Sequence, residues 1–168
     1  MSITMYNASV SVFQKMLGNL SIILDKAESH AAARKIDPAA LLQSRLFPDM
    51  FTFTKQIQIA CDFAKGATAR LGGVEVPKFD DSEASFADMK SRIAKTLAFI
   101  ATVPPSKIEG SAGNTISVTM GGKPYTYDGL TYLNHIVMPN FYFHLTTAYA
   151  LLRHNGVEIG KYDFIGKV

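Results

Sequence analysis

The sequence predicts an all-α fold: a four-helix bundle with a small β-hairpin inserted before the last helix. Three segments before residue 105 carry apolar residues at alternating steps of three and four, the spacing of a buried helical stripe. Apolar and polar residues alternate strictly only between residues 115 and 127. The most apolar long segment, residues 139–156, starts with proline and ends with Asn-Gly, which mark the two ends of a helix.

Length and composition predict one globular domain covering residues 1–168. Of the 168 residues, 48% are hydrophobic and 18% are charged, a balance that supports a packed core. The net charge of +3 is small and the basic residues are scattered, so we expect no nucleic-acid surface. We find no signal peptide and no apolar run of membrane-spanning length, and Cys61 has no second cysteine to pair with. A cytoplasmic protein without a membrane partner is predicted.

The first helix follows from one long stripe of apolar residues. Asp37-Pro38 ends it, because the residue before a proline is disfavoured in helical conformation. Residues 37–47 form a connection with a single helical turn through Leu41 and Leu42. The stripe consists of Tyr6, Val10, Phe13, Leu17, Leu20, Leu24, Ala27 and Ala31.

The second helix is predicted to begin near Pro48-Asp49 and to end at Gly72-Gly73. The loop from Val74 to Asp81 shows no periodic pattern. The apolar seam of the helix is Met50, Phe53, Ile57, Ala60, Ala64, Ala67 and Leu71, and the expected solvent face is Lys55, Gln58, Asp62 and Lys65.

The third helix is predicted to begin with a capping box formed by Ser85 and Asp88, with Ser82 as an alternative cap one turn earlier, and Pro104-Pro105 ends it. Its buried residues are predicted to be Phe86, Met89, Ile93, Leu97 and Ile100.

The hairpin alternates on both strands around the turn Gly121-Gly122, with Ile116, Val118 and Met120 on the first strand and Tyr125 and Tyr127 on the second. Because an isolated hairpin is only marginally stable, it should lie against the helices. Tyr125, Tyr127 and Tyr132 either line a ligand pocket or only pack, and packing is the commoner role of such residues.

The last helix is preceded by a short helical piece, residues 129–137, that Asp128 can cap. Pro139 either kinks one continuous helix, which would free the carbonyl of His135, or starts a new one. The tail after Gly156 has no helical period and should pack along the bundle.

Common catalytic motifs are absent from the sequence. It contains no His-Glu-x-x-His, no phosphate-binding loop and no Glu-x-x-His pair of the di-iron bundles. His144 is the one ionisable side chain in the middle of the last helix, and on helical spacing it lies beside Phe141, Leu145 and Ala148. It is either a buried neutral imidazole with a hydrogen-bond partner, or a metal ligand or acid–base group.

Four motifs carry a resemblance to a known family. They are Phe47–Phe51, Gln56–Lys65, Pro139–His144 and Leu152–Gly156. Together they make the chain similar to the bacterial family called domain of unknown function 1993, which resembles in fold the DinB/YfiT-like superfamily of four-helix bundles. The resemblance implies a DinB-like bundle and a homodimer. The resemblance also implies a possible metal site, because many members of the superfamily bind a divalent metal through three histidines. Several members are thiol-dependent transferases or isomerases.

The resemblance also places the site. The last helix of the superfamily reads His-x-x-x-His-x-Gly-Gln, and in that register the second histidine is His144 and the first falls on Asn140. The third ligand falls near Gln56, within about one helical turn. Zn²⁺ and Ni²⁺ prefer imidazole, thiolate or carboxylate, whereas amides suit a polar ligand held by hydrogen bonds.

These observations predict a small-molecule pocket with Asn140, His144 and Gln56 as ligand-binding residues and a lost or weak site for Zn²⁺ or Ni²⁺ at His144. One alternative is an active metal-dependent enzyme of thiol-transferase type, or one with His144 as catalytic base. A second alternative is a structural dimer in which His144 is a core residue.

Overall fold

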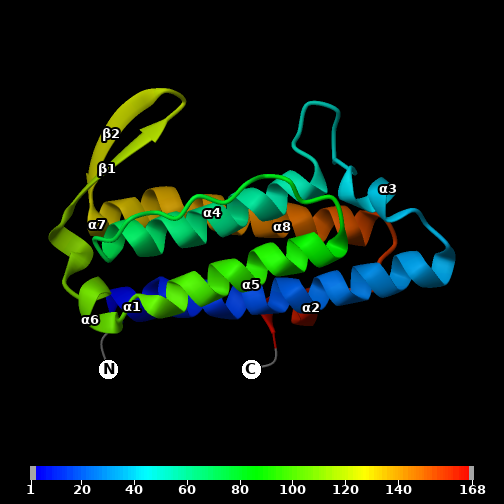
Figure 1. The fold of residues 1–168 in the computed structure, drawn as a ribbon, viewed down its shortest axis with the longest axis horizontal. Helices are drawn as coiled ribbons and strands as arrows, with labels where there is room; N and C mark the ends of the chain where they lie inside the picture. The colour runs from blue at the N-terminus through cyan, green and yellow to red at the C-terminus, as the bar shows by residue number, and fades with distance from the viewer. Residues whose placement is uncertain (1–2, 167–168) are drawn as a thin grey trace.

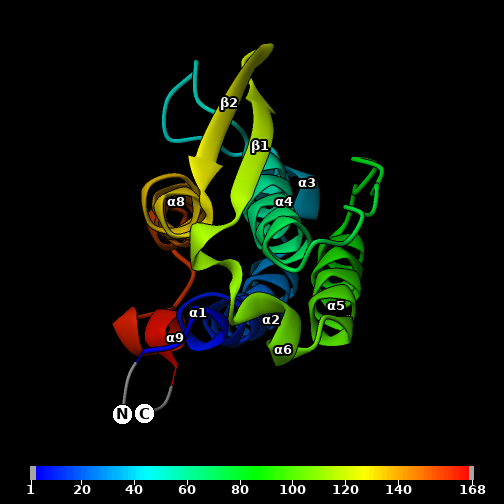
Figure 2. The same ribbon diagram turned by 90° about the vertical axis from the view of Figure 1, so that its left-hand side faces the viewer.

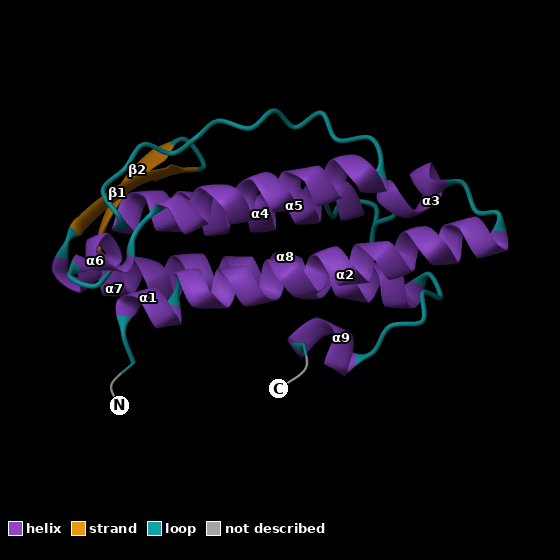
Figure 3. Cartoon of the chain, turned by 60° about the horizontal axis from the view of Figure 1, so that its bottom comes forward, coloured by secondary structure: helices purple, strands orange, loops and turns teal. Residues whose placement is uncertain are grey.

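The computed structural model describes residues 3–166 and is mostly helical with one small antiparallel hairpin, as predicted (Figures 1 and 3). The four long helices are α2 (Val10–Arg34), α4 (Phe53–Leu71), α5 (Phe86–Thr102) and α8 (Met138–His154). Figure 1 shows that α2 and α8 run in one direction and α4 and α5 in the other. Shorter helices precede, join or follow them: α1 (Met5–Ala8), α3 (Pro38–Leu42), α6 (Pro105–Ile108), α7 (Gly129–Thr131) and α9 (Lys161–Ile165).

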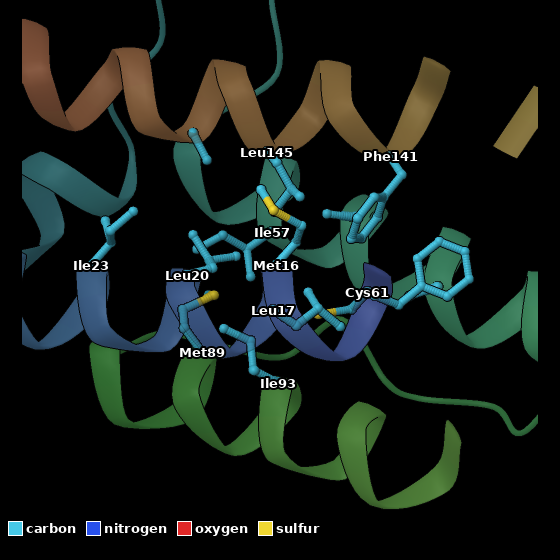
Figure 4. Packing of buried hydrophobic residues seen from close by; sticks show 14 of the residues in the cluster. Met16, Leu17, Leu20, Ile23, Ile57, Cys61, Met89, Ile93, Phe141 and Leu145 are labelled. Carbon is cyan, nitrogen blue, oxygen red and sulfur yellow. The ribbon is translucent and has the colours of Figure 1, made fainter. Parts of the chain in front are cut away.

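All four long helices contribute to one hydrophobic cluster (Figure 4). Phe13 of α2 and Phe141 of α8 meet edge to face, with ring centroids 4.9 Å apart. Leu17, Ile57 and Ile93 are buried between the helices, which confirms the phase of the first three apolar stripes at these positions. Leu97 is only partly buried at the edge of the cluster.

The first helical segment is interrupted at Ser9, where the backbone leaves helical geometry and the side-chain hydroxyl donates to the carbonyl of Met5 at 2.6 Å. The long helix α2 then continues to Arg34. The single turn expected in the following connection is α3, capped by Asp37, whose carboxylate accepts from the Ala39 N–H at 2.9 Å.

The second long helix begins later than predicted. It starts at Phe53, where the Thr52 hydroxyl caps the free N–H of Lys55, rather than at Pro48-Asp49. The guanidinium of Arg45 donates to the carbonyls of Pro48 and Met50 at 3.3 and 3.1 Å and so holds this stretch as a loop. Met50, predicted to lie in the helical seam, is therefore outside the helix.

Part of the predicted solvent face of α4 is buried, which corrects the expectation for Gln58 and Lys65. Because α4 and α5 run in the same direction, the chain between them must return along the length of the bundle, and it covers this face (Figure 1). Gln58 donates to Glu83 of this crossover at 2.8 Å, and the Lys65 ammonium lies 4.1 Å from the ring centroid of Phe79.

Arg92 of α5 ties the crossover to the bundle. Its side chain is only 1% exposed, and it contacts Asp62 of α4 at 3.0 Å, Asp81 at 3.0 Å and Glu83 at 2.8 Å. Burial by itself would raise the pKa of Glu83, but hydrogen bonds from Arg92 and Gln58 outweigh it and the pKa is lowered. The start of α5 has the predicted cap, in which the Asp88 N–H donates to the Ser85 hydroxyl at 3.1 Å.

The hairpin consists of β1 (Thr115–Met120) and β2 (Lys123–Asp128), with Ile116 opposite Tyr127 and Val118 opposite Tyr125. The predicted turn at Gly121-Gly122 has positive φ at both residues, which glycine adopts without strain. Figure 2 shows the hairpin rising from the bundle between α4 and α8.

Residues 129–154 follow one continuous helical path, so Pro139 does not start a separate helix. A π-helical turn, η2 (Tyr132–Val137), precedes α8, and the Met138 N–H bonds to the carbonyl of Leu133. Proline lacks an N–H and its ring crowds the carbonyl four residues earlier, and the wider π turn relieves both effects.

The tail packs along α2 as expected but contains the short helix α9, which its sequence pattern did not indicate. Lys26 binds Asp163 at 2.7 Å, and Asn19 donates to the Phe164 carbonyl at 3.0 Å. Within residues 3–166, none of the helices has the length and apolar character needed to cross a membrane.

Candidate functional site

His144 and Gln56 are brought together across the interface of α8 and α4. Nδ1 of His144 lies 2.7 Å from Oε1 of Gln56, and Nε2 of Gln56 donates to the carbonyl of Phe51 at 3.2 Å. Because the amide nitrogen is committed to Phe51, the amide oxygen is the atom that faces the ring. His144 therefore carries its proton on Nδ1 and presents the lone pair of Nε2.

His144 is 8% exposed as a residue, and its ring sits between two aromatic side chains. Phe63 is nearly parallel to it with centroids 6.2 Å apart, and Phe143 meets it edge on at 5.2 Å. Burial lowers the pKa of His144, so the imidazole is neutral at pH 7. Nε2 has no hydrogen-bond partner among the described residues and is not sealed from solvent. It is available as a neutral acceptor.

Because its pKa is lowered on folding, His144 should make the free energy of unfolding fall as the pH falls. Because the folded-state pKa lies below the unfolded value of about 6.5, the unfolded chain binds more protons as the pH falls, and stability is lost below that pH. Urea unfolding at pH 7.5 and 5.5 should show a smaller loss for His144→Gln than for the unmodified chain. His154→Gln, an exposed histidine on the same helix, is the matched control and should retain the full loss. Parallel pH profiles for the unmodified chain and His144→Gln would contradict this assignment.

Asn140 lies one helical turn before His144, but its side chain is engaged elsewhere. Nδ2 of Asn140 donates to the carbonyl of Ile136 at 2.7 Å, and its amide bonds to neither His144 nor Gln56 in the described structure. The structure thus joins two of the three predicted site residues directly and holds the third against its own backbone.

These residues do not fit a strong Zn²⁺ or Ni²⁺ site. His144 offers one imidazole nitrogen, while the oxygen of Gln56 already accepts from Nδ1 and amides are weak ligands for these ions. In the part of the chain that the structure describes, no group of three or more His, Cys, Asp or Glu side chains is arranged so that it could hold a metal ion.

A cavity of about 180 Å³ lies between α4, η2 and β1, and none of Asn140, His144 and Gln56 lines it. Phe63 lines the cavity and also packs against the His144 ring, so it connects the two. Larger depressions are present as well. One of about 550 Å³ shares Asp62 and Arg70 with this cavity, and one of about 430 Å³ is lined by Phe143. Another, about 560 Å³ and mainly on α2, is bordered mostly by charged and polar side chains. The lining of the smaller cavity is Asp62, Phe63, Arg70, Val118, Thr119, Met120, Tyr132 and Ile136.

Of the three tyrosines singled out from the sequence, only Tyr132 lines this cavity, whereas Tyr125 and Tyr127 stack on each other with centroids 6.3 Å apart. Sequence reasoning did not identify Phe63 and Arg70 as site residues. Their spacing held a signal, because Gln56, Phe63 and Arg70 follow one another every seven residues and so share one face of α4.

The helical fold with its inserted hairpin is of the DinB type, as the comparison with a solved structure shows. The chain is similar to a DinB family member from Shewanella denitrificans whose crystal structure is known, with 43% sequence identity and a TM-score of 0.89. The match covers 97% of this chain and 92% of the other chain. The chain belongs to the family described as domain of unknown function (DUF1993), which matches residues 5–165. No curated protein matches it.

Proposed function

We propose that this protein binds a small molecule in the cavity between α4, η2 and β1, with the His144–Gln56 pair supporting its wall through Phe63. The observation that carries the proposal is the lining: Phe63, Ile136, Val118 and Met120 are apolar, and a few polar groups converge among them. An apolar hollow with a small number of placed polar groups is the usual form of a small-molecule site.

We propose in addition that His144 holds a divalent metal weakly at most. The Gln56 oxygen already accepts from His144, and the Asn140 oxygen is an amide oxygen, a weak ligand for these ions. Nε2 of His144 is therefore the one good donor of the predicted triplet. Zn²⁺ added to the tag-free protein should bind below one equivalent, and mild chelation should remove it.

Asn140→His restores two imidazoles one turn apart on α8 and should raise Zn²⁺ or Ni²⁺ affinity by at least about tenfold, roughly 1.4 kcal/mol. Isothermal titration of both proteins measures this. Asn134→His is the matched control, because it adds a histidine at an exposed position of η2 and should gain little. No gain for Asn140→His would show that the two side chains diverge.

The enzyme alternative draws on the free lone pair of Nε2 of His144, a neutral acceptor suited to a general base. Stoichiometric, chelator-resistant metal in the unmodified protein would overturn the weak-metal proposal and favour a metal-dependent enzyme of thiol-transferase type.

A further inference from the structure

Arg70 carries a positive charge that no carboxylate neutralises among the described residues. The ion pairs of residues 3–166 involve Lys26, Lys55, Lys65, Lys90 and Arg92 instead. The partner of Arg70 is a neutral group, the hydroxyl of Tyr132, which accepts from Nη1 at 3.1 Å. A half-buried guanidinium at the wall of a cavity therefore retains most of its hydrogen-bonding capacity.

Asp62 is the one carboxylate in the lining of the cavity, and its charge is already offset. Its Oδ1 binds Lys65 at 2.9 Å and Arg92 at 3.0 Å. In the ion-pair network that includes Asp62, the three carboxylates of Asp62, Asp81 and Glu83 are balanced by the three cations Lys55, Lys65 and Arg92. The charge of Arg70 is left over, and it gives the polar end of the cavity a positive charge.

Gly66 leaves room for the guanidinium of Arg70 because it has no side chain. A Cβ at this position would lie 2.5 Å from Nη1 of Arg70, so the guanidinium occupies the space that a side chain would need. Glycine in a helix interior is less favourable than alanine, and Gly66 lies in the middle of α4. The less favourable glycine therefore lies at the turn of α4 where the guanidinium of Arg70 packs against the helix backbone.

We propose that the cavity binds the carboxylate of a small monoanionic ligand, held by Arg70 and Tyr132, with the apolar part of the ligand against Phe63, Ile136 and Met120. This inference rests on the proposed function and names its ligand class. The Tyr132 oxygen accepts from Arg70, so the hydroxyl hydrogen is free to donate to the same carboxylate. A volume of about 180 Å³ limits the ligand to a small one, and a single guanidinium matches one negative charge better than the near double charge of a phosphate.

The test compares benzoate with its neutral analogue benzamide, and with inorganic phosphate, by following the methyl signals of Val118, Met120 and Ile136 in the full chain. Benzoate should bind at least about tenfold more tightly than benzamide, as expected for a hydrogen-bonded charge. Arg70→Gln should abolish this preference. Arg153→Gln removes the same charge from an exposed position of α8 and should preserve it.

Two further variants separate binding from stability. Gly66→Ala should leave the melting temperature unchanged or raise it, because alanine favours the helix, while benzoate affinity falls as the guanidinium is displaced. Tyr132→Phe keeps the ring and should weaken benzoate more than benzamide, because the hydrogen bond to the charged carboxylate is stronger than the one to the amide oxygen. If Gly66→Ala binds benzoate as tightly as the unmodified chain, Arg70 is not the anchor.

The outcomes distinguish this inference from the proposed function. Equal affinity for benzoate and benzamide would overturn the carboxylate assignment and leave a ligand-binding cavity in place. Tighter binding of phosphate than of benzoate would overturn the monocarboxylate class. If neither benzoate nor benzamide shifts the three methyl signals at the highest soluble concentration, both the inference and the proposed small-molecule site are wrong.

Discussion

Replacing Arg92 by alanine should lower the free energy of unfolding by about 3–5 kcal/mol, because it leaves the carboxylates that surround the guanidinium without their shared cation. Glu83 is 10% exposed and loses its charged partner, whereas Asp62 and Asp81 are more than 40% exposed and are rehydrated more easily. The lower end of the range is therefore expected. Urea unfolding at pH 7 measures the change.

Lys55→Ala is the control for this network. Lys55 and Asp81 form an ion pair at 2.6 Å, but both side chains are more than one third exposed. Loss of this pair should therefore lower the free energy of unfolding by only about 0–1 kcal/mol. A loss for Arg92→Ala no greater than that for Lys55→Ala would show that the crossover is held mainly by packing.

The network also bears on the candidate site, because Asp62 belongs to both. Its Oδ1 binds Arg92 while its side chain lines the cavity beside Phe63 and Arg70. Loosening the crossover should therefore disturb the cavity as well. The role of Arg92 is for that reason tested by the stability of the Arg92→Ala variant and not by its ligand binding.

Ile57→Ala should lower the free energy of unfolding by about 2–5 kcal/mol through lost burial and the cavity left behind. Ile57 is completely buried in the cluster that all four long helices share (Figure 4), so neighbouring side chains can fill the space only in part. Chemical unfolding with an unchanged denaturant slope would show that stability, rather than the compactness of the unfolded state, has changed.

Lys55→Ala serves again as the comparison, since it lies two residues away on the same helix at a half-exposed position. Its truncation removes little buried area. A larger loss at Lys55 than at Ile57 would mean that the side chains of α4 are rotated relative to the described structure.

Several features of the fold could be predicted because neighbours in the sequence determine them. The capping residues Ser85 and Asp128 act on N–H groups three residues away, and Gly121-Gly122 forms its turn locally. The position of Gln56 opposite His144 came from the register of the family resemblance, and the structure places their polar atoms in contact. The start of α4 was misplaced because the carbonyls of the preceding loop bond to a guanidinium, which leaves no periodic signal.

The sequence by itself determined the helices, the hairpin and the candidacy of His144, because the spacing of apolar residues records which face of each element is buried. The tertiary structure alone decided that α4 and α5 run in the same direction, so that an aperiodic crossover buries Lys65 and surrounds Arg92. It also decided which nitrogen of His144 carries the proton and that Arg70 meets Tyr132. Such contacts join side chains far apart along the chain, and their geometry exists only once the packing of the helices has fixed their relative direction and rotation.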